Sequence, residues 1–445
     1  MNETIRAKTS SLVTAGIVFL LMLGYCKLAG LPLFIPFFLL LYSFHLMLFK
    51  RATGKRILHL GLLLVVIVFT ATAMTDYSRY SPYYIPVSAI AMLTILLFND
   101  LQLSFSMSFI TSAVITMVVG GGVDFLLTFF IGGLVAAYAI KDARARGTIL
   151  RAGIIVGAVQ VAGFLLFHPA LTSVAYVHEI KPLFINGLVS ALVVLGVLKI
   201  FEYLFGELTN FSLLELSDSI HQPLLKRLAF ESPGTYHHSL LLSNLAGAAA
   251  DAIDANVLLV KVGAYYHDIG KLVKPHYFTE NQMMADNKHD DLEPSMSRLV
   301  ILNHVKEGVD IARANGLNEK LIDFILQHHG TSLIHFFYQR ALTEAHGEEV
   351  GEENYRYPGP KPQTRETAIL MLADAVEGAT RSLDEHTQPK IDEVVRRVMN
   401  NKFIDGQLDE CALTLREINT ISSTFTKVLS AMYHVRIKYP DAPSK

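Results

Sequence analysis

The sequence predicts an all-α protein: a polytopic helical membrane domain followed by an all-α domain that faces the cytoplasm. Long apolar runs are confined to residues 1–204, which hold only 14 Lys and Arg and 7 Asp and Glu. Residues 205–445 hold 24 and 33, which is ordinary usage for a soluble domain. In this second half, apolar residues recur at helical spacing, and no segment alternates as a half-buried strand would.

The first half contains about eight apolar runs, most of them near the roughly 20 residues that cross a bilayer. They lie at residues 11–26, 32–49, 57–75, 84–98, 101–119, 123–141, 149–167 and 182–204. The pair 84–98 and 101–119 is the least regular, because both runs are short and only Asn99 and Asp100 separate them. We therefore expect a domain at 1–204 that lies in a lipid bilayer.

Basic residues in the short connections predict the orientation of these spans. Arg6 and Lys8, KRATGKR at 50–56 and KDARARG at 141–147 should be cytoplasmic, and the alternate connections should lie outside. With eight spans, both termini and everything after Phe205 are then cytoplasmic. A secretory signal at the N-terminus is the alternative, but a second apolar run follows at once and favours a membrane hairpin.

The membrane half lacks the usual marks of a transporter. Ionisable residues in mid-membrane commonly form ion or substrate pathways. Here Asp100, Asp124 and Arg151 lie at span ends, and Lys199 can reach the cytoplasmic edge. His45 is the one intramembrane exception, and a packed histidine explains it more simply. We expect this half to anchor the chain, and a sensing role stays open.

Residues 205–234 have apolar positions at helical spacing and predict a connector helix into a domain at 235–445. The helices expected there lie at 236–254, 257–272, 295–315, 318–329, 332–346, 364–386, 389–402 and 413–438. The stretch 343–363 interrupts them, since it is acidic and then rich in Pro and Gly. It is either a surface loop or a lid beside a functional site.

Histidine is concentrated in the second half, which contains thirteen of the seventeen. Three doublets stand out, His237-His238, His267-Asp268 and His328-His329, together with His304 and Asp374. A lone buried histidine is more often a hydrogen-bonded core residue than a metal ligand. A set spread over separate predicted helices favours ligands, because no common structural need would place it.

These residue types suit a particular chemistry. Imidazole and carboxylate ligands without thiolate favour iron, manganese or other first-row ions. Cys26 and Cys411 are too isolated to form a disulfide framework or a thiolate zinc site. Two ions about 3.5–4 Å apart can activate a water molecule and clamp a phosphoryl group. Asp268 can bridge such a pair, and Gly330 after the third doublet would let adjacent side chains converge.

The ordered motifs TYHHS (235–239), HDIGK (267–271), NHV (303–305), HHGTS (328–332) and LAD (372–374) resemble the HD superfamily of metal-dependent phosphohydrolases. With the spans before them, and with RYPGPKPQTRETAILMLADAVEGATRSL, they are similar to the seven-transmembrane HD family. The characterised members of that family are cyclic di-AMP phosphodiesterases. The resemblance covers nearly the whole chain, and it implies hydrolysis of a cyclic dinucleotide to linear pApA at a bimetallic site.

The resemblance also implies which residues hold the metal ions, expected to be two divalent first-row ions such as manganese or iron. One ion would be held by His238, His267, Asp268 and Asp374, and the other by Asp268, His304, His328 and His329. In its doublet, His238 is the implied ligand, and His237 is expected to pack or to form a supporting hydrogen bond.

Asp268 and Lys271 are the residues expected to be catalytic. Lys271 follows Asp268 by one helical turn and is expected to meet a phosphate oxygen; a surface lysine is the alternative. Thr331, Tyr338 and Arg381 are further expected substrate contacts, and each could equally be a structural polar residue.

The chain differs from the family in the connection after its first span, and it lacks a signature of the related cyclic di-GMP hydrolases. Members usually carry a large extracellular domain after the first span, whereas here KLAG (27–30) joins the first two spans, which puts regulation from outside in doubt. Related cyclic di-GMP hydrolases continue their paired histidines into a Gly-Tyr-Pro triplet. RYPGP at 356–360 has another order and place, so cyclic di-AMP is the favoured substrate.

Two other functions stay open. The HD site could act on another cyclic dinucleotide or nucleotide, because metal ions act on the phosphoryl group and not on the base. The other open function is a receptor that binds a nucleotide without cleaving it. Against a receptor, the chain keeps every metal-ligand position, whereas a receptor could tolerate losing some. The expected partners are a cyclic dinucleotide and the lipid bilayer, with no DNA or RNA polymer, and a homodimer is allowed. The resemblance implies a bacterial inner membrane.

Overall fold

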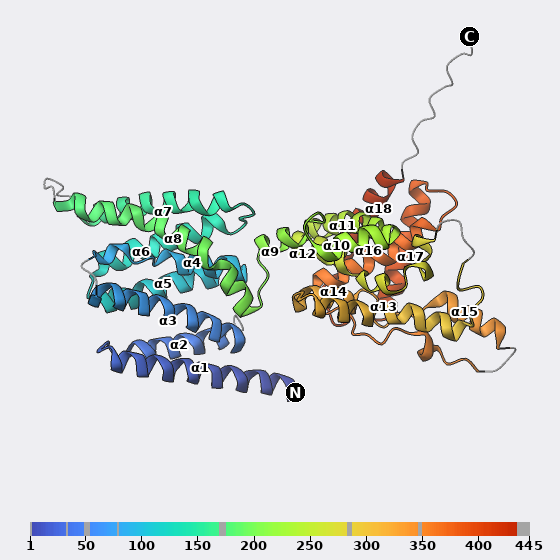
Figure 1. Cartoon of the computed structure of the whole chain (residues 1–445), viewed down its shortest axis with the longest axis horizontal. Coiled ribbons are helices and arrows are strands. Elements are labelled where there is room, and N and C mark those ends of the chain that lie inside the picture. Colours follow the sequence, from blue (N-terminus) through green and yellow to red (C-terminus); the bar gives the residue numbers. More distant parts are fainter. Residues whose placement is uncertain are drawn as a thin grey trace, which may run out of the picture. The chain divides into compact units, whose positions relative to one another are not determined.

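The computed structural model describes residues 2–32, 34–48, 54–77, 80–168, 175–282, 287–345 and 349–433. The chain divides into two compact units, Met1–Phe211 and Ser212–Lys445. Within the described residues every regular element is a helix, and the one β contact is an isolated bridge between Leu333 and Arg356 (Figure 1). The all-α fold class predicted from the sequence is confirmed.

The first unit consists of apolar helices. They are α1 (Asn2–Leu28), α2 (Phe34–Leu48), α3 (Gly54–Tyr77), η1 (Pro82–Tyr84), α4 (Ser88–Phe98), α5 (Leu101–Val119), α6 (Val123–Ile140), α7 (Arg146–Phe167) and α8 (Ala175–Phe205). Five segments among the described residues are long and apolar enough to cross a membrane: Gly54–Asp76, Leu101–Val119, Val123–Ile140, Arg146–Phe167 and Glu179–Phe205. The chain is therefore a multi-pass membrane protein, and the count of eight spans stays a prediction.

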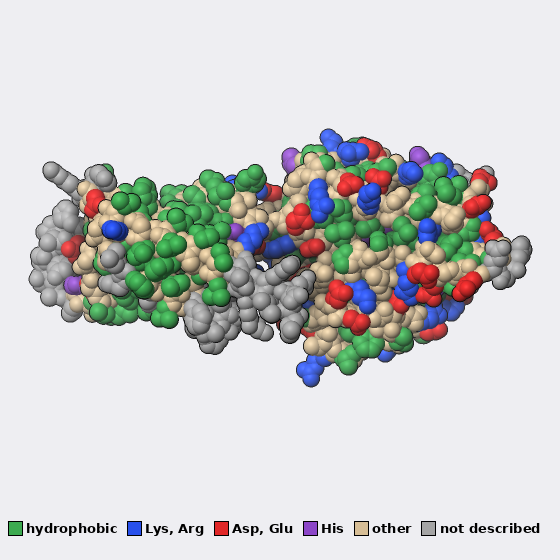
Figure 2. Space-filling view, turned by 90° about the horizontal axis from the view of Figure 1, so that it is seen from below, with side chains coloured by type: hydrophobic (Ala, Val, Ile, Leu, Met, Phe, Trp, Pro, Cys, Tyr) green, Lys and Arg blue, Asp and Glu red, His purple; other side chains and the backbone are tan. Residues whose placement is uncertain are grey.

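The surface of this unit suits a lipid environment. Large apolar side chains such as Leu20, Leu41, Phe69, Ile154 and Leu192 are exposed on it. Figure 2 shows hydrophobic side chains over most of the visible surface of the first unit, whereas Lys, Arg, Asp and Glu are interspersed over the second. Exposed apolar area of this extent is unusual for a protein surface in water.

The expected span at 84–98 differs most from the structure. Its helix α4 has 11 residues, all of them buried, and it packs against α5, α6 and α8. With η1 it forms the apolar stretch Pro82–Phe98, which is shorter than the five segments above, and its crossing of the membrane stays a prediction. Asn99 ends α4 in the left-handed conformation, and the Asp100 carboxylate then caps α5 by accepting from Leu103 N. The two polar residues thus form a tight helix–helix turn.

Small residues let α7 and α8 pack closely. A Cβ on Gly153 would lie 2.7 Å from Gly187 O, and one on Gly157 would lie 2.4 Å from Phe184 O. Glycines four residues apart commonly allow such close packing between membrane helices. Beside this contact, the buried Asn186 amide donates to the carbonyl oxygens of Tyr83 and Ile85. The polar group in the apolar interior is therefore satisfied.

The second unit is built around a buried central helix. Its elements are α9 (Asn210–Leu216), which begins just before the division between the units, α10 (Pro223–Glu231), α11 (Pro233–Ala252), α12 (Val257–Tyr266), η2 (Ile269–Val273), η3 (Pro275–Tyr277), η4 (Thr279–Asn281), α13 (Pro294–Ala314), α14 (Glu319–Gln327), α15 (His335–Glu344), η5 (Glu352–Tyr355), α16 (Arg365–Arg381), α17 (Gln388–Ile404) and α18 (Leu415–Met432). Helix α16 packs against α11, α12, α14, α17 and α18. Residues 368–373 of α16 are buried, as expected for a helix enclosed by others.

Two local expectations are corrected. The connector predicted as one helix at 205–234 is divided into α9 and α10 by the turn at 217–222, after which Pro223 begins a new helix, and Gly206 separates it from α8 with φ +63. The helix expected at 257–272 ends at Tyr266, and residues 269–273 form the 3₁₀ turn η2. The His267-Asp268 pair therefore lies at a helix end, where the backbone changes direction.

Candidate active site

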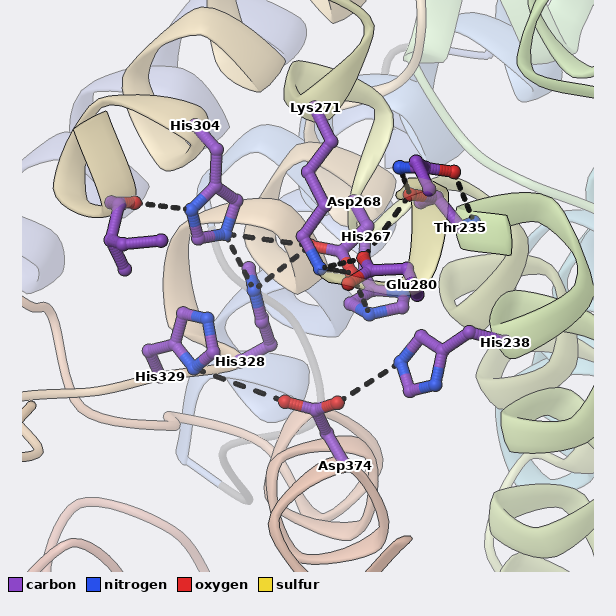
Figure 3. Close-up of polar contacts among 12 residues, drawn as sticks. Thr235, His238, His267, Asp268, Lys271, Glu280, His304, His328, His329 and Asp374 are labelled. Atoms are coloured by element: carbon purple, nitrogen blue, oxygen red, sulfur yellow. Dashed lines mark hydrogen bonds and ion pairs between the residues drawn. The ribbon is translucent and has the colours of Figure 1, made fainter. Parts of the chain in front are cut away.

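Five segments of the second unit bring the expected ligands together (Figure 3). His238 comes from α11, His304 from α13 and Asp374 from α16. The two doublets, His267-Asp268 and His328-His329, follow the last residues of α12 and α14. All seven expected ligand residues thus face one region. Outside it lies His237, which is exposed and so does not pack as expected.

Three of the imidazoles are oriented in the same way. The Nδ1–H group of each ring donates to the carbonyl oxygen three residues earlier, since a carbonyl can only accept. These bonds are His267 to Ala264 at 2.8 Å, His304 to Ile301 at 2.5 Å and His328 to Ile325 at 2.8 Å. In each ring the Nε2 lone pair is therefore turned toward the centre of the site.

Asp268 occupies the centre. Its Oδ2 lies 3.1 Å from His267 Nε2 and 2.8 Å from Lys271 Nζ. Its Oδ1 lies 3.4 Å from His304 Nε2 and 3.7 Å from His328 Nε2. One oxygen of this carboxylate thus faces one imidazole and an ammonium group, and the other oxygen faces two further imidazoles.

Asp374 spans the opposite side in the same manner. Its Oδ1 lies 3.1 Å from His238 Nε2, and its Oδ2 lies 3.9 Å from His329 Nδ1. The His329 ring stacks on Tyr357, with 4.2 Å between the ring centroids. Tyr357 belongs to the acidic and Pro-rich stretch 343–363, so this stretch lies beside the site.

Burial keeps three imidazoles neutral. It lowers the pKa of His304, lowers that of His328 to about 3, and lowers that of His329 well below its ordinary value. His238 differs, because hydrogen bonds to Asp374 and Glu377 outweigh its burial and raise its pKa to about 9. Burial would also raise the pKa of Asp268, but His267 and Lys271 hold it well below the usual range. The site thus holds three neutral imidazoles and one protonated imidazole, His238, beside ionised carboxylates.

This donor set fits divalent cations. Ligand atoms of His238, His267 and Asp268 lie within 4.8 Å of one another, and so do those of His304, His328 and His329. Among the described residues, the buried His267 Nε2 and Asp268 Oδ1 have no hydrogen-bond partner. Moreover, His304 Nε2 and His328 Nε2 are 3.2 Å apart, although both rings carry their proton on Nδ1. Two facing lone pairs repel each other, and a cation between them removes the repulsion.

Lys271 is held by two carboxylates. Its Nζ lies 2.7 Å from Glu280 Oε1 and 2.8 Å from Asp268 Oδ2, and its side chain is 14% exposed. The alternative of a surface lysine is therefore wrong. The ammonium charge is compensated within the protein, and a contact with phosphate stays a prediction.

The three other expected substrate residues have structural partners. Thr331 accepts from Gln407 Nε2 through its hydroxyl and donates to Gln407 Oε1 through its backbone N–H. Tyr338 packs against Tyr355 in a cluster with Phe337 and Ala341. Arg381 binds Glu377 through Nη2, at 2.6 and 2.7 Å. Their roles toward a substrate stay predictions.

Glu377 is a site residue that the sequence reasoning missed. Its carboxylate is 1% exposed, and its Oε2 lies 3.1 Å from His238 Nδ1. The signal was present in ADAVEGATR, because Glu377 follows Asp374 by three residues and precedes Arg381 by four, which places all three on one helix face. Glu280 was also missed, since it lies in the turn η4 and no helical spacing connects it to Lys271.

Two family models match the chain. The model described as a 7TM receptor with intracellular HD hydrolase matches residues 9–209, and the HD domain model matches residues 235–379. The cyclic-di-AMP phosphodiesterase PgpH of Bacillus subtilis is 38% identical over 394 residues, which are 86% of this chain and 55% of the relative. The protein of the same name from Listeria monocytogenes is 42% identical over 321 residues, which are 71% and 44%. The chain thus spans about half the length of these relatives.

Solved structures match the second unit. The crystal structure of the L. monocytogenes PgpH HD domain is 47% identical, covers 48% of this chain and is itself covered completely, with a TM-score of 0.46. The same domain in complex with cyclic-di-AMP is 47% identical, with 48% and 99% covered and a TM-score of 0.47.

Proposed function

The chain belongs to the family of 7TM receptors with an intracellular HD hydrolase, and we propose that it hydrolyses cyclic di-AMP to linear pApA. In this reaction a water oxygen adds to one phosphorus atom and the bond from phosphorus to the 3′ oxygen breaks. The relatives named cyclic-di-AMP phosphodiesterases support this substrate, and so does the HD domain crystallised with cyclic-di-AMP. The family resemblance stated from the sequence is confirmed.

The placement of Asp268 carries the proposal. One of its oxygens faces His267, the other faces His304 and His328, and both groups of histidines offer buried nitrogen ligands. A carboxylate between two sets of imidazoles is the arrangement that a bimetallic phosphohydrolase needs. We propose two divalent first-row ions, manganese or iron, held by the seven residues in the two sets expected from the sequence.

When bound, these ions would neutralise charge on the phosphoryl group and activate the attacking water. The protein supplies the remaining requirements. Lys271 keeps Asp268 ionised and fixes the direction of its carboxylate, and Glu280 holds Lys271 in turn. Burial keeps His304 and His328 neutral, so their nitrogens stay available as ligands. The same burial excludes bulk water and strengthens the electrostatic interactions within the site.

The location is part of the proposal. We place the first unit in the inner membrane of a bacterium and both termini, with the HD unit, in the cytoplasm, where a nucleotide second messenger is available. The basic connections KRATGKR and KDARARG support this orientation. The homodimer stays a prediction, and so does the absence of a nucleic-acid polymer among the partners.

The test is turnover by the full chain purified in detergent and loaded with Mn²⁺. Cyclic di-AMP should yield pApA, identified by liquid chromatography with mass spectrometry. Asp268→Ala should lower the rate by more than about 100-fold, the upper cost of losing even an outer partner of a metal ligand. Unchanged turnover in Asp268→Ala would show that the site is assigned wrongly.

The same assay separates the rival functions. Faster hydrolysis of cyclic di-GMP or of a mononucleotide in competition with cyclic di-AMP would favour another HD hydrolase. Tight binding of cyclic di-AMP to the metal-loaded chain without any product would favour a receptor.

A further inference from the structure

Lys402 is a positively charged residue beside the site. It is not among the residues expected to be catalytic, to bind metal or to contact substrate. It lies in the last turn of α17, and its Nζ donates to Ser332 Oγ at 2.5 Å. Ser332 closes the HHGTS motif, and its backbone N–H donates to the carbonyl of His329. Lys402 is therefore connected to His329 through a single residue, Ser332, of the loop that carries the histidine pair.

The surroundings of Lys402 are built to fix its position. Gln407, just after α17, binds both the backbone and the hydroxyl of Thr331. Arg356 binds Asp405 at 2.9 and 3.2 Å and also donates to the Thr331 carbonyl. The end of α17, the HHGTS loop and the segment that carries Tyr357 are thus tied into one corner.

The charge of Lys402 is not compensated in this corner. Among the described residues no carboxylate lies within ion-pair distance of its ammonium group, and its one hydrogen-bond partner is a neutral hydroxyl. The nearby Asp405 is already paired with Arg356. Burial lowers the pKa of Lys402, and Asp374 and Asp405 only partly oppose this effect. A partly buried cation without a counterion is costly, so an anion bound there is stabilised.

Lys271 shows the opposite arrangement. Its charge is compensated by Asp268 and Glu280, so it offers little net attraction to a phosphate. The Asp374 carboxylate raises the pKa of Lys402, and Ser332, which Lys402 contacts, donates to the carbonyl of His329. Lys402 therefore belongs to the Asp374 and His329 side of the site, away from the carboxylate proposed to bridge the metal ions.

We propose that Lys402, with the Ser332 hydroxyl, binds the phosphodiester of the cyclic dinucleotide that is not being cleaved. The inference rests on the proposed function, because the cleaved phosphodiester would lie at the seven ligand residues. A cyclic dinucleotide carries a second phosphodiester with one negative charge, which matches the single uncompensated ammonium. The Ser332 hydroxyl accepts from Lys402 and keeps its own proton for an oxygen of that phosphate.

The test compares two substrates in the full chain loaded with Mn²⁺. Lys402→Gln should raise KM for cyclic di-AMP about tenfold or more, the effect of losing a hydrogen bond to a charged group, with a smaller change in kcat. For bis(p-nitrophenyl) phosphate, which has a single phosphodiester, KM should rise far less. Lys402→Arg keeps the charge and should recover part of the loss.

Lys390→Gln is the matched control, because Lys390 lies on the same helix, is 49% exposed and pairs with Glu385. It should leave KM for both substrates as in the wild type. The Mn²⁺ content of Lys402→Gln should match the wild type, and its unfolding temperature should equal or exceed that of the wild type, since the variant removes an uncompensated charge.

Two results would overturn the inference alone: a wild-type KM for cyclic di-AMP in Lys402→Gln, or an equal rise in KM for both substrates. A reduced unfolding temperature with unchanged KM would assign Lys402 a structural role instead. If the wild type cleaves bis(p-nitrophenyl) phosphate but not cyclic di-AMP, the proposed function itself fails, and this inference with it.

Discussion

Among the histidines proposed as metal ligands, His238 is oriented by charged partners. His267, His304 and His328 each donate Nδ1–H to a carbonyl of their own helix. His238 Nδ1 instead lies 3.1 Å from Glu377 Oε2 and 3.0 Å from Arg381 Nη2, and because both nitrogens carry protons, the Glu377 carboxylate accepts from both. A carboxylate partner fixes the tautomer and makes the opposite nitrogen a stronger ligand. Arg381 compensates the charge of Glu377, which allows a carboxylate to be buried there.

We expect Glu377→Gln to weaken Mn²⁺ binding about 10- to 100-fold, because an amide oxygen accepts the His238 proton less strongly. Isothermal titration of the metal-stripped full chain would measure the affinity. Glu393→Gln is the control, since Glu393 lies 74% exposed on α17. Equal affinity in Glu377→Gln and the wild type would contradict the role given to Glu377.

At the scale of elements, both ligand doublets lie where a helix ends. His267 and His328 are the C-cap residues of α12 and α14, and Asp268 and His329 follow them. Adjacent side chains on a continuing helix diverge by about 100°. Beyond the helix end the backbone turns, so both members of a doublet can face one site. After the second doublet, Gly330 makes this turn with φ +55, which favours glycine.

The contact between η2 and α13 requires glycine. A Cβ on Gly270 would lie 1.8 Å from His304 O and 2.5 Å from Gly308 N, so the two backbones would have to separate. We expect Gly270→Ala to lower the free energy of unfolding by about 2 kcal/mol. It should also weaken Mn²⁺ binding, because Asp268 and His304 would move apart.

Gly378→Ala provides the comparison for Gly270→Ala. Gly378 lies on the exposed side of α16, and nothing lies within 4 Å of its added Cβ. Its unfolding temperature should be equal to or slightly above that of the wild type, because alanine favours helix by about 0.5–1 kcal/mol. Similar unfolding temperatures for the two variants would contradict the importance of the η2–α13 contact.

The Arg356–Asp405 ion pair holds the end of α17 against the HHGTS loop, and its effect should depend on pH. Burial opposes ionisation of Asp405, but Arg356 and Gln407 hold its pKa below the ordinary value. A carboxyl group whose pKa is lowered in the folded state stabilises the fold at pH values above its unfolded pKa of about 3.9. This stabilisation is lost as the pH falls from there through the lower pKa of the folded state.

We expect Asp405→Asn to cost about 1 kcal/mol at pH 7, which makes local opening about fivefold more frequent. Hydrogen exchange of the Thr331 amide, relative to the wild type at the same pH, would measure this. The ratio should stay constant from pH 7 to about 5 and approach one below about pH 4. A ratio independent of pH would exclude the ion pair as its cause.

At the scale of the whole molecule, a membrane unit and an HD unit share one chain. The proposed orientation places the connection at residue 80 outside the cell and the loop at residue 144 inside it. Tyr80 is 70% exposed and Arg144 is exposed, so cysteines at these positions would be accessible to a reagent.

We expect Tyr80→Cys to react with a membrane-impermeant maleimide in intact cells, and Arg144→Cys to react only after lysis. Both variants would be made with Cys26 and Cys411 replaced by serine, so that no native thiol reacts. The opposite labelling pattern would invert the orientation and place the HD unit outside the cytoplasm.

The sequence by itself determined the fold class and the membrane half, and it named the set of candidate metal ligands. Hydropathy is sufficient for the membrane half, because a bilayer requires long apolar helices. Helical periodicity placed most helices of the HD unit within a few residues. The spacing of His and Asp in HDIGK and HHGTS indicated metal chemistry, because few other needs explain such doublets.

Only the tertiary structure decided which charged side chains have a partner of opposite charge and where individual helices begin and end. It placed Glu377 behind His238 and neutralised Lys271 with Glu280. It also placed Lys402 beside the HHGTS loop with no carboxylate partner in the described part of the chain. It further showed that residues 88–98 of the expected span 84–98 form a helix buried on all sides, α4. These features depend on contacts between residues far apart in the chain, and neither periodicity nor local motif spacing contains that information.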